Sequence, residues 1–360
     1  MRAAVFHDAG DVRLEHVPDP TPAAGEVVVR VLRSGMCGTD LGEWTKGPRT
    51  FPVRTPHPVT GHHGPMIPGH ELVGEVVETV PGSGWETGRL VASGAGVSCG
   101  TCDRCREGRT NLCRRYYTLG LNTHGGMAEL VSVPMSTLRP VPDGLGLDAA
   151  GLAQPMAVGL HAARRAGVRP GDTVVLIGAG AIGTFVLAGL RDLVDCDVVV
   201  VDFAGRRLER AARTGATTTV AAGDDGDAAV AEAVGPGGAD VVIEASGALG
   251  MVGRAQAMVR PGGRILQVGL PSGPQEIDLH ALVMREVTLE TTLAHVCGDD
   301  LSPAMEILAR TGLATELLDS VRPLSDLAGQ LDRMASGGLD GKVLFDPTME
   351  PEIDTRSSDT

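Results

Sequence analysis

The chain lacks several features that mark particular classes of protein. No uninterrupted apolar run in its 360 residues approaches the roughly 20 residues that cross a bilayer. Acidic residues outnumber Lys and Arg by 45 to 31, and the net charge of −14 would repel nucleic acid and anionic lipid. The N-terminal sequence MRAAVFHDAG reads as the start of a strand and not as an apolar export segment. We therefore expect a cytoplasmic protein whose partner is a small molecule, with no nucleic acid and no membrane.

Aromatic side chains and lysine are both scarce. Phe, Trp and Tyr make up 2% of the residues, and Lys46 and Lys342 are the two lysines among 31 Lys and Arg residues. We attribute this bias to the base composition of the source genome more than to function. The hydrophobic content of 42% is typical of a globular protein, and the length allows two domains, each with its own core.

Four of the seven cysteines lie within the run CGTCDRCREGRTNLC. Three of them have the spacing C-x2-C-x2-C, and seven further residues precede the fourth, so one tight loop can wrap four thiolates around a single zinc ion. Four thiolates close the tetrahedron and leave no open position, which makes this zinc structural. The predicted ligands are Cys99, Cys102, Cys105 and Cys113.

Other uses of these cysteines are less favourable. Cysteines three apart on a tight loop form a strained disulfide, and the chain has no export signal that would place it in an oxidising compartment. An iron–sulfur cluster would use the same four sulfur atoms, and it stays open as the alternative to zinc.

The chain divides into two regions with different periodicity. Up to about residue 150, short alternating strands are broken by Gly and Pro, which indicates an antiparallel, barrel-like domain. From Asp172 onward, apolar strands such as TVVLI and ADVVIEAS alternate with helical segments such as RRLERAARTG. This alternation predicts a parallel sheet with right-handed crossovers. Beyond about residue 290 the elements become shorter and mixed, and we expect this stretch to close against the first domain.

A dinucleotide-binding fingerprint opens the second region. Gly178, Gly180 and Gly183 form G-x-G-x-x-G between a strand and a helix, and Asp202 ends the next strand. The first glycine permits the tight turn, the second lets the backbone approach a pyrophosphate, and the third lets the helix pack on the strand. Asp202 can accept two hydrogen bonds from the adenosine ribose and would repel a 2′-phosphate. The motif thus favours NAD over NADP, although two arginines at the start of the next helix could accommodate that phosphate.

Two further motifs suggest a second metal site. GMCGTD contains Cys37, and PGHELVGEV contains His70 and Glu71. Together with the cysteine loop, the fingerprint, GGMAELVSV, QPMAVGLHA and the late GKVLF, they make the chain resemble the zinc-dependent medium-chain dehydrogenase/reductase family over nearly its whole length. Its motif pattern is most similar to the butanediol, sorbitol and threonine dehydrogenase branch.

The resemblance implies an α/β fold with a GroES-like, β-rich catalytic domain and a Rossmann domain with a doubly wound parallel sheet. In that family the active site lies between the two domains. The implied ranges are 1–153 for the catalytic domain with its zinc loop at 99–113, 154–290 for the Rossmann domain, 291–346 for a return to the catalytic domain, and 347–360 for a polar tail that we expect to be disordered. We also expect a homodimer or homotetramer.

The resemblance also assigns roles by matching motif. Cys37 and His70 would bind a catalytic zinc, Thr39 would hand on the alcohol proton, and Asp40 and Glu71 would orient or supplement the ligands. The positions implied to contact NAD(H) are Gly178, Gly180, Ile182, Gly183, Asp202, Arg207, Val268, Gly269 and Leu270.

Two positions depart from the family pattern. Where polyol and butanediol dehydrogenases have Glu-Pro as the source of the third zinc ligand, this chain has Gln154-Pro155, and where most relatives have a relay histidine it has Gly42. An amide oxygen can bind zinc but removes one negative charge, so the metal would acidify a bound alcohol more strongly and be held less tightly. Glu71 could swing in to restore neutrality, or the catalytic zinc could be absent. Gly42 leaves Thr39 to pass its proton to a ribose hydroxyl, to water or to a histidine of the loop described next.

A long loop fills the 32 residues between Cys37 and His70 and includes TPHPVTGHHGPMIP. It looks like the long loop of the butanediol dehydrogenase branch. We interpret its histidines as part of a solvated polar loop and not as metal ligands. They are His57, His62 and His63.

These features lead to one main hypothesis and two alternatives. The main hypothesis is a zinc-dependent NAD(H) oxidoreductase that interconverts a small secondary alcohol, such as a diol, polyol or cyclitol, and its ketone. The first alternative is a metal-independent reductase of a conjugated C=C or C=N bond on the same fold. The second is a catalytically silent NAD-binding protein.

Overall fold

A computed structural model describes residues 1–350, which form two compact units. Unit 1 comprises Met1–Gln154 and the chain from Leu318 onward, and unit 2 comprises Pro155–Leu317. Within residues 1–350 no helix is both long enough and apolar enough to cross a membrane.

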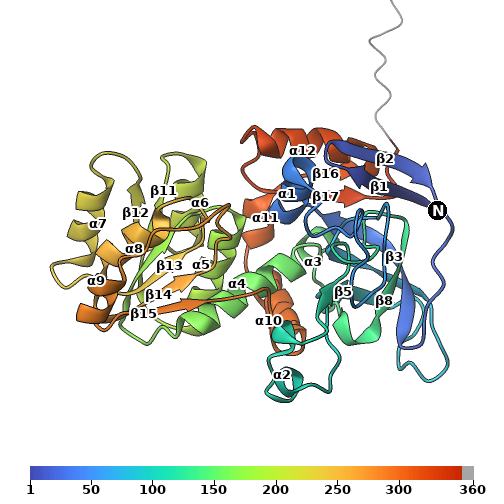
Figure 1. Ribbon diagram of the computed structural model, residues 1–360, viewed down its shortest axis with the longest axis horizontal. Coiled ribbons are helices and arrows are strands. Elements are labelled where there is room, and N and C mark those ends of the chain that lie inside the picture. Colours follow the sequence, from blue (N-terminus) through green and yellow to red (C-terminus); the bar gives the residue numbers. More distant parts are fainter. Residues whose placement is uncertain (351–360) are drawn as a thin grey trace, which may run out of the picture. The chain divides into compact units, whose positions relative to one another are not determined.

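Unit 1 is built on a seven-stranded sheet in the order β16-β17-β3-β4-β5-β9, with β8 also paired to β3. Strand β17 (Lys342–Asp346) runs antiparallel to β3 (Glu26–Gly35), so the last strand of the chain lies beside an early one (Figure 1). The alternating valines of β3 enter one apolar core with residues of β4, β5 and β8. The other elements of this unit are β1 (Arg2–Asp8), β2 (Asp11–His16), α1 (Gly38–Lys46), β4 (Glu71–Glu78), β5 (Leu90–Ser93), β6 (Gly96–Val97), α2 (Asp103–Arg106), β7 (Tyr117–Thr118), β8 (Leu130–Pro134), β9 (Leu138–Pro140), α3 (Leu147–Ala150), β16 (Leu318–Pro323) and α12 (Leu327–Ala335).

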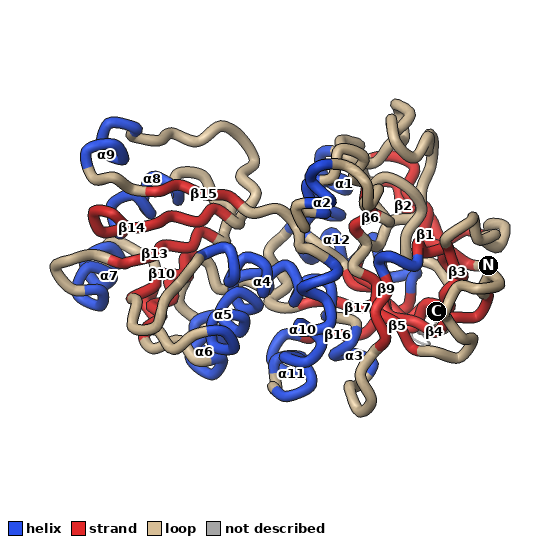
Figure 2. Tube along the Cα trace, turned by 90° about the horizontal axis from the view of Figure 1, so that it is seen from below, coloured by secondary structure: helices blue, strands red, loops and turns tan. Residues whose placement is uncertain are grey.

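Unit 2 is a six-stranded parallel sheet in the order β12-β11-β10-β13-β14-β15. Its strands are apolar on both faces: Val174 and Leu176 pack with α4, α5 and α6, whereas Val175 and Ile177 pack with α7, α8 and α9. Figure 2 shows the two groups of helices on opposite sides of the strands. This arrangement confirms the doubly wound parallel sheet. The elements are α4 (Ala153–Ala166), β10 (Thr173–Ile177), α5 (Ala181–Leu193), β11 (Asp197–Asp202), α6 (Arg206–Thr214), β12 (Thr218–Ala221), α7 (Gly226–Val234), β13 (Ala239–Glu244), α8 (Met251–Met258), β14 (Val259–Gln267), α9 (Leu279–Met284), β15 (Thr288–Thr291), α10 (Cys297–Arg310) and α11 (Leu313–Leu317).

The second unit extends further along the chain than the sequence analysis expected. The return to the first unit was placed at residue 291, but residues 291–317 belong to unit 2 and the return begins at Leu318. The reason is packing: α10 lies against α5, and the ion pair between Arg213 and Glu316 joins α6 to α11. Short, mixed elements alone did not reveal these contacts.

The tail that was expected to be disordered falls largely outside the described residues, which end at Glu350. The part that is described, 347–350, is held at the surface of unit 1. There the carbonyl oxygen of Pro347 accepts a hydrogen bond from Arg2 at 3.0 Å, and Glu350 forms an ion pair with the same arginine.

Candidate functional site

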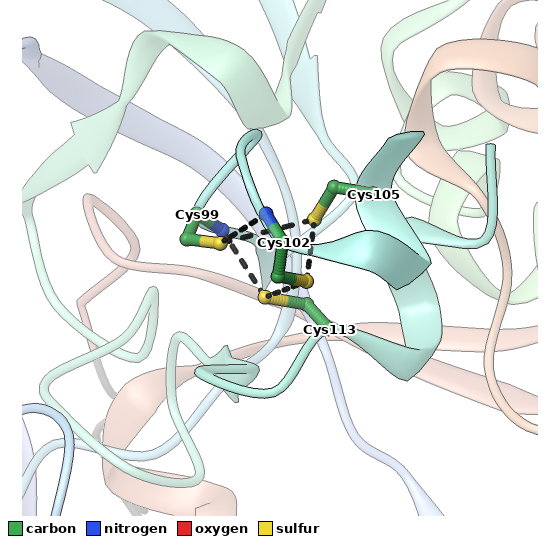
Figure 3. Close-up of side chains that lie close together, drawn as sticks. All are labelled: Cys99, Cys102, Cys105 and Cys113. Atoms are coloured by element: carbon green, nitrogen blue, oxygen red, sulfur yellow. Dashed lines mark hydrogen bonds between the residues drawn. The ribbon is translucent and has the colours of Figure 1, made fainter. Parts of the chain in front are cut away.

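The four loop cysteines converge on one point. Cys99 and Cys102 come from the turn before α2, Cys105 lies in α2, and Cys113 follows the next short helical turn (Figure 3). The Sγ atoms of Cys102 and Cys105 are 3.5 Å apart, those of Cys102 and Cys113 are 3.9 Å apart, and those of Cys99 and Cys105 are 4.0 Å apart. All four lie within 4.8 Å of one another.

These sulfur distances fit one tetrahedral metal ion. With zinc–sulfur bonds of about 2.3 Å, the edge of a thiolate tetrahedron is about 3.8 Å. An iron–sulfur cluster of four irons binds each cysteine to a different iron and would hold the sulfurs further apart. The geometry therefore favours a single ion over the cluster that the sequence left open.

Backbone groups of the loop stabilise negative charge on the sulfurs. The Sγ of Cys113 accepts from the backbone N–H of Cys99 at 3.2 Å and from that of Arg115 at 3.3 Å. Donors from Thr101 lower the pKa of the Cys99 thiol to about 6, whereas burial raises the pKa of Cys105 to about 11. A divalent cation fits four thiols arranged in this way, because the loop already supplies the donors that thiolates need.

A second group of metal-binding side chains lies in the interior of unit 1. Ligand atoms of Cys37, His70 and Glu71 lie within 4.8 Å of one another. Cys37 caps the N-terminus of α1, where the helix dipole favours negative charge. His70 and Glu71 stand at the start of β4, and both are buried.

Two glycines make room for these side chains. Gly35 pairs with Glu71 across β3 and β4, and a Cβ on Gly35 would lie 2.2 Å from the Glu71 carboxylate. Gly69 has a φ of +100°, and a Cβ there would lie 2.7 Å from the Ser34 hydroxyl. Any other residue at either position would displace the strand that carries the ligands.

Two charged residues, Lys342 and Asp40, flank this group. Lys342, at the start of β17, places its Nζ 2.7 and 2.6 Å from the two carboxylate oxygens of Glu71 and donates to the carbonyl oxygen of Met36 at 2.5 Å. Asp40 accepts the backbone N–H of Cys37 at 2.9 Å, and its other oxygen lies 3.8 Å from Nδ1 of His70. At 3.8 Å no hydrogen bond forms, so both of those atoms are buried without a partner.

The pKa values reflect an excess of negative charge. Burial opposes a positive charge on His70, but Cys37, Asp40 and Glu71 outweigh it and raise the pKa of His70 to about 9. The same neighbours raise the pKa of Lys342 against the effect of its burial. If Cys37, Asp40 and Glu71 each carry one negative charge and Lys342 one positive charge, a divalent metal ion makes the whole group neutral. The donor set, its burial and its charge therefore fit Zn²⁺.

The remaining predicted residues of unit 1 are placed as follows. Thr39 lies in the first turn of α1 with its Oγ1 4.0 Å from the Cys37 sulfur. Gln154 is the second residue of α4 and is buried, and Gly42 lies in α1 with open space where a side chain would extend. Of these side chains, that of Thr39 therefore lies next to the Cys37 sulfur.

Two of the three histidines of the long loop contact other residues. Nδ1 of His57 accepts the backbone N–H of Thr60 at 3.2 Å, and the ring of His62 packs edge-on against that of His124, with ring centroids 4.6 Å apart. His63 is exposed. The interpretation as a solvated loop describes His63, whereas His57 and His62 are half-buried and help to order the loop.

The glycine-rich turn of unit 2 needs glycine at positions that the fingerprint predicts. Gly178 has a φ of +97°, and a Cβ on Gly183 would lie 1.8 Å from the carbonyl oxygen of Gly178, so neither position tolerates another residue. Gly180 caps α5 and has open space around it, which leaves room for a ligand against the backbone. The turn precedes a helix of 13 residues whose positive end faces that space.

Asp202 ends β11 beside this turn and is 8% exposed. One carboxylate oxygen accepts the backbone N–H of Ala179, and the other that of Phe203, both at 2.6 Å. Each oxygen keeps a lone pair for a ribose hydroxyl. Asp202 therefore also holds the glycine-rich turn in place, a role that the motif alone did not reveal.

The other predicted coenzyme positions lie around the same edge of the sheet. Ile182 and Val268 pack on the core of unit 2, Gly269 is half-buried, and Leu270 is 80% exposed. Arg207 is the second residue of α6 and is half-buried. Three residues of the structure were not predicted from the sequence: Lys342, although the scarcity of lysine and the GKVLF motif were signals, the buried Glu244 at the end of β13, and the half-buried Gln267 at the end of β14.

Comparisons with known proteins agree with this architecture. Residues 23–143 match the family described as "Alcohol dehydrogenase GroES-like domain", and residues 181–310 match "Zinc-binding dehydrogenase". The (R,R)-butanediol dehydrogenase of Bacillus subtilis is 32% identical over 333 residues, covering 91% of this chain and 94% of that protein. The chain belongs to the zinc-type medium-chain dehydrogenase family. As a member of this family it is an alcohol dehydrogenase, with Zn²⁺ and NAD(H) as its cofactors.

Other members of the zinc-type medium-chain dehydrogenase family are similar to this chain in sequence and in structure. The L-threonine 3-dehydrogenase of Saccharopolyspora erythraea is 31% identical over 359 residues, covering 97% of this chain and 100% of that protein. The crystal structure of 2R,3R-butanediol dehydrogenase from Bacillus subtilis superposes with a TM-score of 0.86 at 29% identity, covering 96% of this chain and 99% of that one. The branch expected from the motifs is confirmed.

Proposed function

We propose that the chain is a zinc-dependent oxidoreductase that interconverts a small secondary alcohol, such as a diol, polyol or cyclitol, and its ketone with NAD(H). The observation that carries the proposal is the buried convergence of Cys37, His70 and Glu71 on a chain that also has a dinucleotide turn. Relatives named butanediol, sorbitol and threonine dehydrogenases support this substrate class.

The proposed ligands of the catalytic zinc are Cys37, His70 and Gln154. Glu71 is held by Lys342, so it stays outside the resting ligand set unless that ion pair opens. Nδ1 of His70 lies 3.8 Å from a carboxylate oxygen of Asp40, which leaves Nε2 of the ring for the metal and lets Asp40 orient the ring by its charge, without a direct hydrogen bond. Bound zinc supplies a Lewis acid that polarises the substrate oxygen.

Thr39 is the proposed acceptor of the alcohol proton. Its hydroxyl lies next to the Cys37 sulfur in the first turn of α1, and a hydroxyl can accept one proton while it donates its own. With Gly42 in place of a relay histidine, the proton leaves to a ribose hydroxyl or to water. His57 accepts a hydrogen bond within its own loop, and the ring of His62 packs against that of His124 outside the loop.

Asp202 is the proposed determinant of NAD over NADP. Its carboxylate would bind the ribose hydroxyls and repel a 2′-phosphate, and Phe203, which is 76% exposed, offers that phosphate no donor. Fold alone does not set this preference, since a putative zinc-binding dehydrogenase of Sinorhizobium meliloti, 28% identical with a TM-score of 0.83, was crystallised with NADP. We expect kcat/KM with NAD(H) to exceed that with NADP(H), and Asp202→Ala to narrow the ratio while weakening both, because Ala179 loses its acceptor. A wild-type preference for NADPH would contradict the assignment.

Metal analysis and a substrate screen test the whole proposal. Two zinc ions per chain, together with NAD-dependent oxidation of diols or polyols followed by NADH absorbance, are the expected results. One zinc per chain with turnover of a conjugated alkene or iminium would favour the metal-independent reductase. One zinc with NADH binding and no turnover would favour a silent NAD-binding protein.

A further inference from the structure

A carboxylate without a cationic partner lies at the end of β13 in unit 2. Glu244 is 0% exposed, and within residues 1–350 no Lys, Arg or His forms an ion pair with it. Its Oε1 accepts the backbone N–H of Ser246 at 2.8 Å and the Ser246 hydroxyl, and its Oε2 accepts Nε2 of Gln267 at 2.5 Å. The backbone N–H of Gly247 lies 3.1 Å from both oxygens. Hydrogen bonds alone therefore compensate this buried charge.

Glu244 stands where the strand order of the sheet reverses. Strands β10 and β13 are neighbours there, and Glu244 pairs in register with Ile177 on one side and with Gln267 on the other. In doubly wound sheets a dinucleotide binds across the carboxyl ends of the strands at this reversal. The carboxylate lies directly beneath that edge.

The turns that follow β10, β13 and β14 pack closely against one another next to Glu244. A Cβ on Gly178 would lie 2.9 Å from the Ser246 nitrogen, and one on Gly269 would lie 2.1 Å from the Gly247 nitrogen. Gln267 extends the network, because its Nε2 also donates to the carbonyl oxygen of Gly269 at 2.8 Å. One carboxylate thus fixes the middle turn, and through Gln267 it fixes the turn after β14.

We propose that Glu244 is a positioning residue for the coenzyme and that it acts through Gln267. It holds the Val268–Leu270 turn in the position that NAD(H) requires for the half of the molecule beyond the diphosphate. This proposal rests on the proposed function, in which Asp202 binds the adenosine ribose of NAD(H) and the glycine-rich turn at Gly178 faces the diphosphate. Glu244 touches no reacting atom. Its effect reaches the coenzyme through the backbone of the two turns.

The network requires a carboxylate and not merely a group of that size. In Glu244→Gln the new amide presents a donor either to the Ser246 and Gly247 nitrogens or to Nε2 of Gln267. A flip of the Gln267 amide would repair that contact, but it would place its oxygen against the carbonyl oxygen of Gly269. Every arrangement leaves one buried contact broken, so the Val268–Leu270 turn must shift.

Dissociation constants for NADH and for ADP, measured by calorimetry on the full chain, test the proposal. We expect Glu244→Gln to raise the Kd of NADH about tenfold, the equivalent of one lost charge-assisted hydrogen bond, and to change that of ADP by less than about twofold. ADP ends at the diphosphate and does not need the turn after β14. The matched control is Glu232→Gln on the exposed face of α7 in the same unit, which should change neither value.

A second variant separates positioning from general loss of structure. Gln267→Met keeps the Glu244 carboxylate and removes the amide that bridges it to the carbonyl oxygen of Gly269, so it should also weaken NADH binding and spare ADP binding. The double variant Glu244→Gln/Gln267→Met should lose no more affinity than the weaker-binding single variant. Three results would each overturn the proposal: equal weakening of NADH and ADP binding, additive losses of NADH affinity in the double variant, or unchanged NADH binding by Gln267→Met. The third result is decisive even if Glu244→Gln does not fold. Failure of the wild-type chain to bind NADH would overturn the proposed function as well, whereas equal NADH binding by wild type and Glu244→Gln overturns this inference alone.

Discussion

The loop cysteines and the Cys37 group, formed by Cys37, His70 and Glu71, are two sets of potential metal ligands within one unit, and they are assembled differently. Cys99 and Cys113, the outermost ligands of the loop, are 14 residues apart, whereas the contacts of Lys342 with Glu71 and Met36 join residues 271 and 306 positions apart. The loop has short helical turns and little core of its own. The Cys37 group sits on β3, β4, β17 and α1, which the core of unit 1 already holds in place.

The difference indicates which set depends on its metal for structure. The loop has little besides the ion to hold four sulfurs together, so its order should be lost with the metal. The Cys37 group is positioned by strands that form without it, so metal loss there should remove activity and spare the fold. Variants of the two sets should therefore separate a loss of activity from a loss of stability.

His70→Ala should reduce kcat/KM for alcohol oxidation by at least about a thousandfold, because the substrate oxygen loses its Lewis acid. Metal content should fall from two ions per chain to one, with the melting temperature lowered by less than about 5 °C. NADH binding should stay within twofold of wild type. The control is His63→Ala in the exposed loop, and full turnover by His70→Ala would exclude zinc chemistry at this site.

Cys102→Ser should show the opposite pattern. Removal of one of four thiolates should release the loop metal and lower the melting temperature by about 10 °C, as expected when a structural ion contributes to folding. Cys196→Ala, at a buried cysteine of unit 2 outside both metal groups, is the control. Equal melting temperatures and metal contents for the two variants would refute a structural metal in the loop.

Lys342→Met should destabilise the fold by about 3 kcal/mol, because it leaves the Glu71 carboxylate buried without its cation. Glu71→Gln in the same chain should recover most of that loss, since it removes the stranded charge. Urea unfolding of both single variants and the double variant measures the coupling. Lys46→Met at the exposed end of α1 should be neutral, and additive effects of the Lys342 and Glu71 changes would argue against a working ion pair.

Gln154→Glu should have the smallest effect. A carboxylate adds charge and basicity to the ligand set, so zinc should resist mild chelation about tenfold longer at the catalytic site. The pH at which a bound alcohol deprotonates should rise, because a less positive shell withdraws less charge from its oxygen. The same substitution in the His70→Ala chain should change neither property, and a change in that background would show that residue 154 acts elsewhere.

Features coded by neighbouring residues could be predicted from the sequence. The loop ligands, the glycine-rich turn and the strands on either side of it depend on spacings of a few residues, and the structure brings those residues together as expected. The GHE motif indicated His70 and Glu71 but not the cation that balances them, because Lys342 reaches Glu71 only through the pairing of β17 with β3.

Features that depend on long-range packing could not be predicted. The extension of unit 2 to Leu317 follows from the contact of α10 with α5, and the double role of Asp202 follows from a turn that folds back onto it. Glu244 gave no signal in sequence, since an acidic residue at a strand end is normally solvated. Its burial results from three turns closing over one position.

The scarcity and placement of lysine also decide how this enzyme can be attached to a surface. Lys342 is shut inside the core, so amine-reactive coupling in water reaches one lysine, Lys46, besides the chain's own amino terminus. Lys46 is the last residue of α1, and Cys37 caps the other end of the same nine-residue helix, a rod about 13 Å long. A support coupled there would hold every molecule by the helix that Cys37 caps. If Cys37 is the proposed zinc ligand, strain on α1 in an immobilised layer would reduce turnover directly.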